Sequence, residues 1–270
     1  MIVSNLGNLE NIEKIKNNVA TVMIEAGEIL MANFGKKLSW QDKKDMGFVT
    51  EVDLKSEKFL KKNLAEILPG ASFWAEESGI EDNNSPYYWV IDPLDGTTNF
   101  AHAIPYFCIS VALTYKGEPI LGFIYNPIMK EMFFAQKDNG AFFNDTPMQV
   151  SKVESFDKAF LAVCIPYERS SDYYKRFISS MSEIIKGTFA FRHCGAAALD
   201  LVYTAAGRYD AVFFENLFWW DFAAGSLLIR EAGGLATDFA NEPIDHNSKS
   251  ILGANKVIHA KLLAIFNKHK

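Results

Sequence analysis

The sequence predicts an α+β fold in which helices pack on sheets. Three observations predict it: apolar residues recur at helical spacing near the N-terminus, short β-rich segments follow from residue 72 to about 163, and helical and β-rich segments alternate after that. No repeat, low-complexity stretch or Pro/Gly/Ser-rich linker interrupts this order. We therefore expect a single domain over 1–270, with an N-terminal half of about 1–150 and a C-terminal half of 151–270.

Two amphipathic helices are expected before residue 70. The first has an apolar stripe that runs from Leu9 to Leu30, and Gly35 is expected to end it. A polar loop with two lysines covers Gln41 to Gly47. The second helix is expected from about Asp53 to Ile67, because Pro69-Gly70 follows.

The β-rich segments predict a mostly antiparallel sheet. They cover 72–75, 88–92, 105–115, 119–126 and 131–136. Tyr115-Lys116-Gly117-Glu118 is typical of a tight hairpin turn, and Asp138-Asn139-Gly140 and Asn144-Asp145 are typical of further turns. Short turns join antiparallel neighbours, whereas parallel strands need long crossovers, so no βαβ repeat is expected here.

The second half is expected to alternate between helix and strand. The expected helices cover about 172–185, 196–206 and 221–232, and a last helix closes the chain. The expected strands lie near 189–192, 209–214, 235–238 and 251–254.

The composition narrows the class of protein. Hydrophobic residues make up 49% and charged residues 22%, which is ordinary for a globular protein. The net charge of −6 argues against partners that are nucleic acids or membrane surfaces. No segment reads as a signal peptide or a membrane span. Cys108, Cys164 and Cys194 have no paired spacing and are expected to be reduced, mostly buried thiols, so we expect a cytoplasmic protein.

The segment Trp89 to Phe100, which reads WVIDPLDGTTNF, carries the strongest functional signal. A buried strand from Tyr88 to Ile91 leads to Asp92 and Asp95, and a turn after it is expected to bring both carboxylates to one point. Mg²⁺ takes oxygen ligands and commonly joins one or two carboxylates to a substrate phosphate. The same residues also suit a plain turn, so the rest of the chain must decide.

Two further acidic motifs lie elsewhere. Glu76 and Glu77 follow a short apolar segment in WAEES, and Asp221 precedes a predicted helix in WWDFAAG. Each has a purely structural interpretation. The two glutamates suit a solvated pair at the start of a polar loop, and Asp221 suits an ordinary N-cap. An N-cap role does not exclude metal binding by the same aspartate.

In this order, the three motifs resemble those of the inositol monophosphatase family of Mg²⁺-dependent, lithium-sensitive phosphatases. The resemblance covers nearly the whole chain, with smaller matches at 48–53, 140–142, 195–200 and 206–210. It implies the family's layered αβαβα sandwich, a homodimer, and hydrolysis of a small phosphorylated metabolite by metal-activated water. Inositol 1-phosphate is the favoured substrate. Fructose 1,6-bisphosphate, 3'-phosphoadenosine 5'-phosphate and histidinol phosphate stay open, because relatives share the metal motifs.

The resemblance also implies roles for individual residues around two Mg²⁺ ions. The implied ligands are the carboxylates of Glu76, Asp92, Asp95 and Asp221 and the carbonyl of Leu94. Thr97 and Asp53 resemble the pair that orients and helps to deprotonate the attacking water, and Glu76 belongs to the same catalytic centre. The backbone N–H groups of Gly96 and Thr97 are expected to bind the phosphate at a helix start. Helix capping is the structural alternative for both Thr97 and Asp53.

The sequence departs from the family pattern at two places. Lys43 and Lys44 lie where relatives often have a lysine and a third, weaker metal site, but Gly47 replaces a common aspartate. A third Mg²⁺ therefore stays open, and solvated loop charges are the favoured interpretation of the lysines. The family glutamate that contacts the substrate is usually seven residues before the helix aspartate, where this chain has Phe214.

Glu215 lies six residues before Asp221. Either a loop shorter by one residue lets Glu215 reach the substrate, or substrate recognition has changed. Ala197 is a further candidate for the pocket wall, although small residues there equally suit close helix packing.

Two other functions compete with a phosphatase. A regulatory protein that keeps a metal site is one, with an interface built on 213–220. A carboxylate-pair glycosidase is the other, since it also needs two acids. The glycosidase does not account for Gly-Thr-Thr after the aspartate pair or for the distant Asp221.

Overall fold

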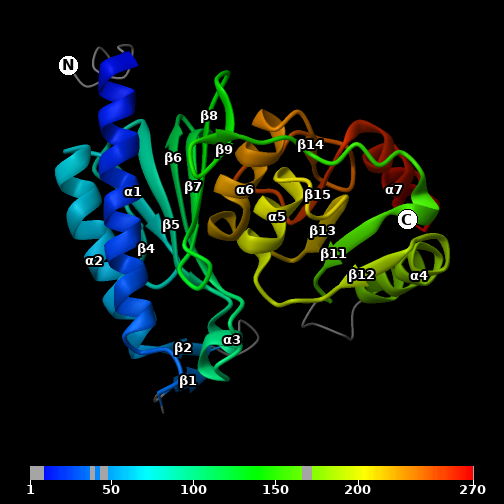
Figure 1. Cartoon of the computed structure of the whole chain (residues 1–270), viewed down its shortest axis with the longest axis horizontal. Helices are drawn as coiled ribbons and strands as arrows, with labels where there is room; N and C mark the ends of the chain where they lie inside the picture. The colour runs from blue at the N-terminus through cyan, green and yellow to red at the C-terminus, as the bar shows by residue number, and fades with distance from the viewer. Residues whose placement is uncertain (1–8, 37–39, 43–47, 166–171, 270) are drawn as a thin grey trace.

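Helices and sheets alternate in five layers in the computed structural model, which describes residues 9–36, 40–42, 48–165 and 172–269 (Figure 1). The outer helices α1 (Leu9–Met31) and α2 (Glu51–Ile67) cover the first sheet, and α5 (Ala197–Ala205) and α6 (Trp219–Glu231) lie between the two sheets. Helices α4 (Asp172–Gly187) and α7 (Lys256–Lys268) cover the far side of the second sheet. The predicted αβαβα sandwich is confirmed.

The first sheet has the strand order β10-β9-β8-β7-β6-β5-β3-β4 within the described residues. Its strands are β3 (Ser72–Ala75), β4 (Gly79–Glu81), β5 (Tyr87–Asp95), β6 (Cys108–Tyr115), β7 (Glu118–Asn126), β8 (Glu131–Gln136), β9 (Gly140–Phe143) and β10 (Thr146–Pro147). All pairs are antiparallel except β3 with β5. The tight turn between β6 and β7 is also confirmed, with Lys116 and Gly117 both at positive φ, the backbone conformation that such hairpins require.

The second sheet is mixed and has the order β12-β11-β13-β15-β14. Its strands are β11 (Phe160–Val163), β12 (Ala190–Arg192), β13 (Ala211–Glu215), β14 (Leu235–Thr237) and β15 (Ser250–Ala254). Strand β11 pairs parallel to both β12 and β13, and no strand was predicted there. Its four apolar residues show no alternation, so periodicity cannot separate them from a buried helix segment.

Four small elements complete the described chain. Strands β1 (Trp40–Asp42) and β2 (Phe48–Thr50) form an antiparallel pair before α2, and the short helix α3 (Thr97–Ala101) follows β5. A single 3₁₀ turn covers Phe156–Lys158. These elements are too short for a periodic pattern, and only the helix start at Gly96 and Thr97 was expected.

The middle helices pack tightly because α5 and α6 carry small residues. A Cβ atom added at Gly225 of α6 would lie 2.6 Å from the Cβ of Leu201 in α5, and one at Gly122 of β7 would lie 3.0 Å from the carbonyl oxygen of Ala224. Real Cβ contacts are essentially never as short as 2.6 Å. The glycines thus let α6 contact both α5 and the first sheet closely. Helix α6 carries Asp221 and so brings it toward the N-terminal half.

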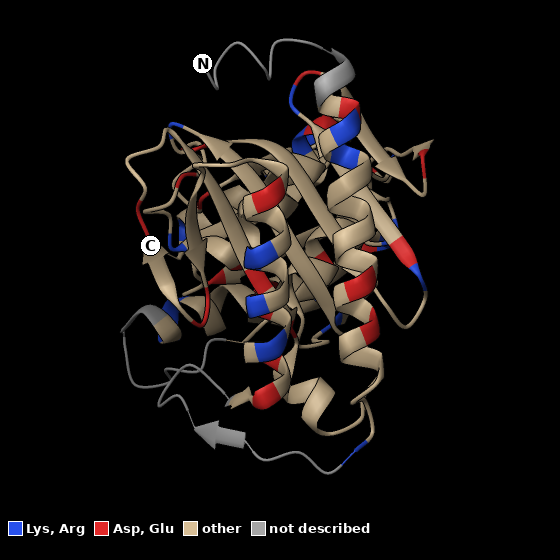
Figure 2. Cartoon of the chain, turned by 90° about the vertical axis from the view of Figure 1, so that its left-hand side faces the viewer, with Lys and Arg blue, Asp and Glu red and all other residues tan. Residues whose placement is uncertain are grey.

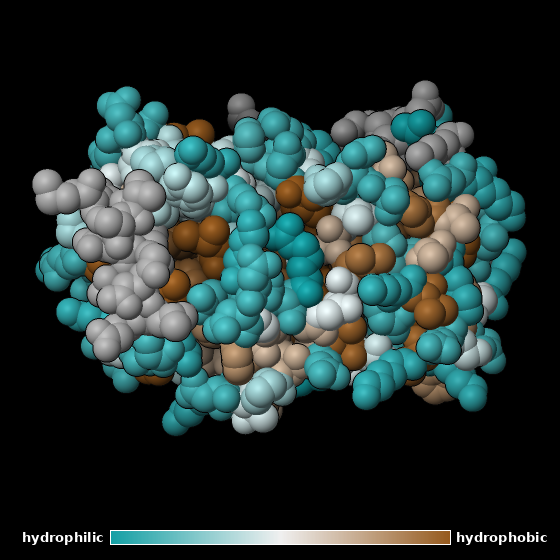
Figure 3. All heavy atoms as spheres, turned by 90° about the horizontal axis from the view of Figure 1, so that it is seen from above, coloured by the Kyte–Doolittle hydropathy of each residue, from teal (hydrophilic) through white to brown (hydrophobic). Residues whose placement is uncertain are grey.

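The surface fits a globular protein. Charged residues of both signs lie along the outer sides of α1 and α2 (Figure 2). Hydrophilic side chains cover most of the face opposite α3, with apolar atoms in separate patches (Figure 3). Within the described residues, no helix combines the length and the apolar character needed to cross a membrane. The thiols of Cys108, Cys164 and Cys194 are free as expected, but only that of Cys108 is buried, and the other two are half-buried.

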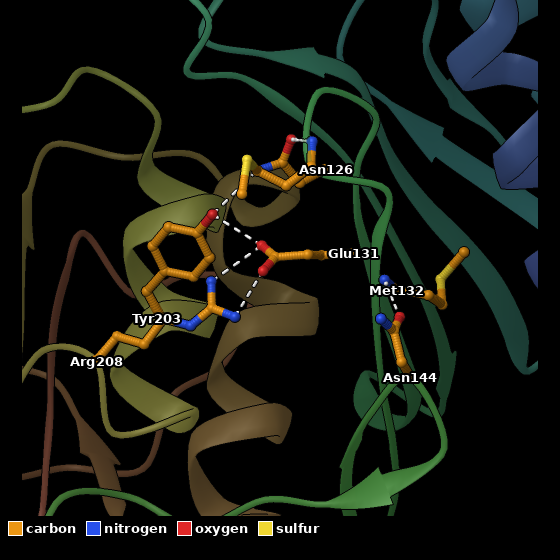
Figure 4. A network of polar contacts seen from close by, with 7 residues as sticks. Asn126, Glu131, Met132, Asn144, Tyr203 and Arg208 are labelled. Carbon is orange, nitrogen blue, oxygen red and sulfur yellow. Dashed lines mark hydrogen bonds and ion pairs between the residues drawn. The ribbon is translucent and has the colours of Figure 1, made fainter.

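An ion pair joins the first sheet to the middle layer (Figure 4). The guanidinium of Arg208 makes two contacts with the carboxylate of Glu131, at 2.6 and 3.0 Å. The hydroxyl of Tyr203 donates to the same carboxylate at 3.0 Å, and the Arg208 guanidinium lies 4.4 Å from the centre of the Tyr203 ring. Glu131 is 7% exposed, so its charge depends on these partners.

Replacing Arg208 with methionine is expected to lower the free energy of unfolding by about 2 kcal/mol, because it leaves a buried carboxylate with one hydroxyl partner. The estimate is below the value for a fully buried pair, since the Arg208 side chain is 36% exposed. Urea unfolding measures the change. Lys137→Met removes the more exposed pair with Glu118 and serves as the control, with an expected cost of about 0.5 kcal/mol or less. Equal costs for the two variants would contradict the prediction.

Candidate active site

Strand β5 carries both aspartates of the central motif. The prediction that the strand ends at Ile91 and a turn follows is wrong, because β5 continues to Asp95. Its pairing with β6 shifts between Asp92, opposite Ser110, and Asp95, opposite Cys108. One extra residue therefore lies on β5, as in a β-bulge. Residues three apart on a regular strand point to opposite faces, and an inserted residue lets the two side chains share a face.

The carboxylate of Asp95 binds the start of α5. Its Oδ1 accepts the N–H of Ala197 at 3.1 Å and its Oδ2 accepts the N–H of Ala198 at 2.7 Å. The first turn of a helix favours a negative charge, because its N–H groups have no partner in the helix. Asp95 thus joins the first sheet to the C-terminal half. The backbone N–H of Ala197 makes one of these contacts, and its role in the wall of a substrate pocket stays a prediction.

Asp53 and Thr97 are in contact, as the resemblance implied. The Thr97 hydroxyl lies 2.9 Å from Asp53 Oδ1 and 2.9 Å from the carbonyl oxygen of Leu94, so its single proton can serve either acceptor. Asp53 is fully buried, and its Oδ2 accepts both the N–H and the hydroxyl of Thr50. Burial is the largest influence on the pKa of Asp53 and raises it above the ordinary value, against these hydrogen bonds.

Neither Asp53 nor Thr97 is the N-cap residue of its helix, as the capping alternatives had assumed. Helix α2 begins at Glu51, earlier than predicted, with Thr50 as its N-cap. Asp53 is the third helical residue and completes a capping box, so it stabilises the helix and bonds Thr97 as well. The N-cap of α3 is Gly96 and not Thr97. The Thr97 hydroxyl is consequently not used for capping.

Gly96 and Asn99 hold the end of β5 against the C-terminal half. Gly96 has φ +90°, and a Cβ atom there would lie 2.9 Å from the carbonyl oxygen of Tyr106, so no other residue fits without a shift. The side-chain amide of Asn99 donates to the carbonyl oxygens of Tyr106 at 2.8 Å and Cys194 at 2.7 Å. Sequence reasoning gave Asn99 no role, although it lies within the central motif.

Glu76 and Asp221 approach the same place from two other elements. Ala75 of β3 lies opposite Ile91 of β5 in a parallel pair, so Glu76 follows beside Asp92. The Glu76 N–H donates to the Ile91 carbonyl at 3.1 Å. Asp221 was predicted to begin its helix, but α6 begins at Trp219. Asp221 lies in the first turn, where its Oδ2 accepts the N–H of Phe218 at 2.7 Å.

Burial and neighbouring negative charges raise the pKa values of the two aspartates of β5. Burial raises the pKa of Asp92 well above its ordinary value, and the negative charges of Glu76, Asp95 and Asp221 raise it further. Burial also raises the pKa of Asp95 to about 6, although the N–H groups of α5 oppose this rise. The other three acids are therefore close enough to Asp92 to repel its charge. A bound divalent cation would remove this repulsion.

The residues fit a hard cation by their chemistry. All the candidate donors are carboxylate or carbonyl oxygens, which Mg²⁺ and similar ions prefer to sulfur or nitrogen. Among the described residues, no three His, Cys, Asp or Glu side chains are already arranged to hold an ion.

The residues expected to contact the substrate are less well defined. Glu215 ends β13 and is half-buried, and burial raises its pKa to about 8. Phe214 is fully buried in the apolar core and is no substitute for a polar contact. The rings of Phe218 and Trp220 stack with their centres 4.8 Å apart beside Asp221. Lys43, Lys44 and Gly47 lie outside the described residues, as does the third metal site expected near them.

Known proteins resemble this chain over nearly its whole length. The model of the inositol monophosphatase family matches residues 9–270. The chain is 38% identical to an inositol-1-monophosphatase of Caulobacter vibrioides, over 88% of this chain and 95% of that protein. It is 35% identical to the Nus factor SuhB of Pseudomonas aeruginosa, over 90% and 92%.

Solved structures give the same result. The extragenic suppressor protein suhB of Bartonella henselae has a TM-score of 0.90 and 35% identity, over 94% of this chain and 99% of that one. The IMPase of Thermotoga maritima has a TM-score of 0.84 and 30% identity, over 93% and 95%. The chain belongs to the inositol monophosphatase family.

Proposed function

We propose that the protein hydrolyses a small phosphate monoester with the help of two Mg²⁺ ions, and that inositol 1-phosphate is the favoured substrate. One observation carries the proposal. The bulge of β5 places Asp92 and Asp95 where the charges of Glu76 and Asp221 act on Asp92, beside the hydrogen bond between Thr97 and Asp53. Family membership and the relatives named inositol-1-monophosphatase support the same activity.

Phosphate monoesters hydrolyse extremely slowly without a catalyst, and their negative charge repels a nucleophile. When bound, Mg²⁺ would neutralise phosphate oxygens and lower the pKa of a water molecule. Glu76, Asp92, Asp95, Asp221 and the Leu94 carbonyl are the residues proposed to hold the ions.

Thr97 and Asp53 are proposed to handle the proton. The Thr97 hydroxyl accepts a hydrogen bond from the attacking water while it donates its own proton to Asp53 Oδ1, 2.9 Å away. Asp53 is fully buried, and its raised pKa makes its carboxylate a better base than an exposed aspartate. The backbone N–H groups of Gly96 and Thr97, at the start of α3, are proposed to bind the phosphate.

Substrate choice within this chemistry depends on the alcohol side of the ester. We propose that Glu215 bonds a hydroxyl of the substrate, since Phe214 is buried and the loop to Asp221 is short. Fructose 1,6-bisphosphate, 3'-phosphoadenosine 5'-phosphate and histidinol phosphate are the alternatives. A cytoplasmic homodimer sensitive to lithium is part of the same proposal.

A regulatory role is the second candidate. It rests on the relatives named Nus factor SuhB, which are as similar to this chain as several of those named inositol-1-monophosphatase. Such a role does not by itself require the buried contact between Asp53 and Thr97.

Release of inorganic phosphate from the four substrates, with and without Mg²⁺, tests the proposed activity. Release that requires Mg²⁺ and strongly favours inositol 1-phosphate is the expected result. Preference for another of the four would change the substrate but keep the mechanism. No Mg²⁺-dependent release from any of them would overturn the phosphatase and favour the regulatory role.

Mg²⁺ is expected to stabilise the fold more at pH 8 than at pH 5. The pKa of Asp95 is raised from 3.8 to about 6 in the folded protein, so the stability contributed by its bound proton is lost as the pH rises through that range. At pH 5 Mg²⁺ must displace this proton, whereas at pH 8 the carboxylate is already charged before the ion binds. Mg²⁺ at about 100 times its dissociation constant adds about 2.7 kcal/mol, or about 5 °C in melting temperature. NaCl of equal ionic strength is the control for thermal unfolding. An equal effect of Mg²⁺ at both pH values would contradict this prediction.

A further inference from the structure

Helix α2 carries three buried polar residues on one side. Asp53, Ser56 and Glu57 are spaced i, i+3 and i+4, which places them on one helix face, and they are 0%, 0% and 4% exposed. Each one bonds a different part of the candidate site. Asp53 bonds Thr97, the Ser56 hydroxyl donates to the carbonyl oxygen of Pro93 at 3.0 Å, and Glu57 Oε2 accepts the N–H of Glu77 at 2.8 Å.

Glu57 is the least expected of the three. A buried carboxylate is costly unless hydrogen bonds offset its desolvation. Its carboxylate accepts the backbone N–H of Glu77, in the half-buried turn after β3. A hydrogen bond from a backbone N–H to a carboxylate is stronger than one between neutral groups. The contact therefore fixes the backbone at that turn.

The backbone of Glu76 is held on both sides. Its own N–H donates to the carbonyl oxygen of Ile91, the residue before Asp92. Its carbonyl group shares a planar peptide unit with the N–H of Glu77, which Glu57 binds. Fixing both neighbouring peptide planes limits φ and ψ of Glu76 and so sets the direction in which its side chain leaves the backbone.

The helix that provides these contacts is firmly packed. Val52, Leu60 and Leu64 of α2 are fully buried in the cluster between the outer helices and the first sheet. Lys61, one turn after Glu57, donates to the Ser78 hydroxyl at 2.9 Å and forms an ion pair with Glu81 at 2.8 Å. The turn after β3 is therefore attached to α2 at more than one point.

We propose that Glu57 is a positioning residue, which directs the Glu76 carboxylate toward Asp92 and thereby sets the affinity of the metal site. The identity of the site as a metal site rests on the proposed function. Glu57 does not touch the ion in this proposal, since it acts through the Glu77 N–H. Ser56 acts in the same way on Pro93, between the two aspartates of β5.

Binding of Mn²⁺ to the protein, measured from the electron paramagnetic resonance signal of the free ion, tests this proposal without relying on activity. Glu57→Leu is expected to weaken Mn²⁺ binding by about tenfold or more, as is usual for residues that orient a metal ligand. Glu57→Gln keeps a carbonyl oxygen for the Glu77 N–H and is expected to restore most of the affinity. Glu66→Leu makes the same substitution at an exposed position of the same helix and should leave binding unchanged.

Thermal unfolding without metal shows whether each variant is folded, and Glu57→Ala replaces Glu57→Leu if the latter is not. Wild-type Mn²⁺ affinity in a folded Glu57→Leu or Glu57→Ala protein would overturn the positioning role. Weakened binding in Glu57→Leu, without any phosphate release by the wild type, would keep the positioning role and overturn the proposed function. A wild-type protein that binds no Mn²⁺ would overturn both.

Discussion

Replacing Asp95 with asparagine is expected to lower Mg²⁺-dependent phosphate release by about a thousandfold, because loss of a metal ligand removes several kcal/mol of transition-state stabilisation. The structure adds a second reason. Both oxygens of Asp95 accept N–H groups from the first turn of α5. An asparagine has one oxygen and one NH₂ group, so one of the two N–H groups would face a donor.

Asp138→Asn is a matched control, since Asp138 is exposed in a hairpin turn far from β5 in the sequence and asparagine tolerates its positive φ. Phosphate release at saturating Mg²⁺ is the measurement, and Mn²⁺ binding shows whether the ion is still held. An unchanged rate in Asp95→Asn would rule out Asp95 as a ligand and with it the mechanism proposed here.

The sequence predicted the layers and most elements because the apolar periodicity of α1, α2 and the long strands is strong. It missed β11, whose apolar residues show no alternation, and it placed the start of α6 two residues late. Helix starts are hard to place where, as at Phe218, the N-cap residue has no side chain that can accept a hydrogen bond.

The sequence named the candidate residues but not the contacts that position them. Glu76, Asp92, Asp95 and Asp221 could be named because motifs carry them. The contact of Asp95 with α5 joins residues 102 or more positions apart, and no local pattern records it. The bulge in β5 and the contact from Glu57 to the Glu77 N–H are likewise tertiary features. A motif names the candidate residues, and their contacts with α2 and α5 hold them in place.

Replacing Thr97 with valine is the second large test, with an expected loss in kcat of about 10²–10⁴-fold. Valine keeps the shape of threonine but has no hydroxyl, so water would no longer reach Asp53 through Oγ1, now 2.9 Å from Asp53 Oδ1. KM for the substrate and Mn²⁺ affinity are expected to change little, since neither carboxylates nor backbone N–H groups are altered. Thr97→Ser keeps the hydroxyl and is expected to retain most of the activity.

Asp53→Asn, alone and combined with Thr97→Val, tests whether Asp53 and Thr97 transfer a proton or only support the structure. If Thr97 and Asp53 act in sequence on one proton, the double variant should be hardly slower than either single variant, because the second substitution removes a step already lost. Additive losses would mean that the two residues act independently. Full activity in Thr97→Val would exclude the relay altogether and leave the 2.9 Å contact as a support for the end of β5. The Thr97 and Asp53 variants thus distinguish a site that performs hydrolysis from one that keeps only the fold of the family.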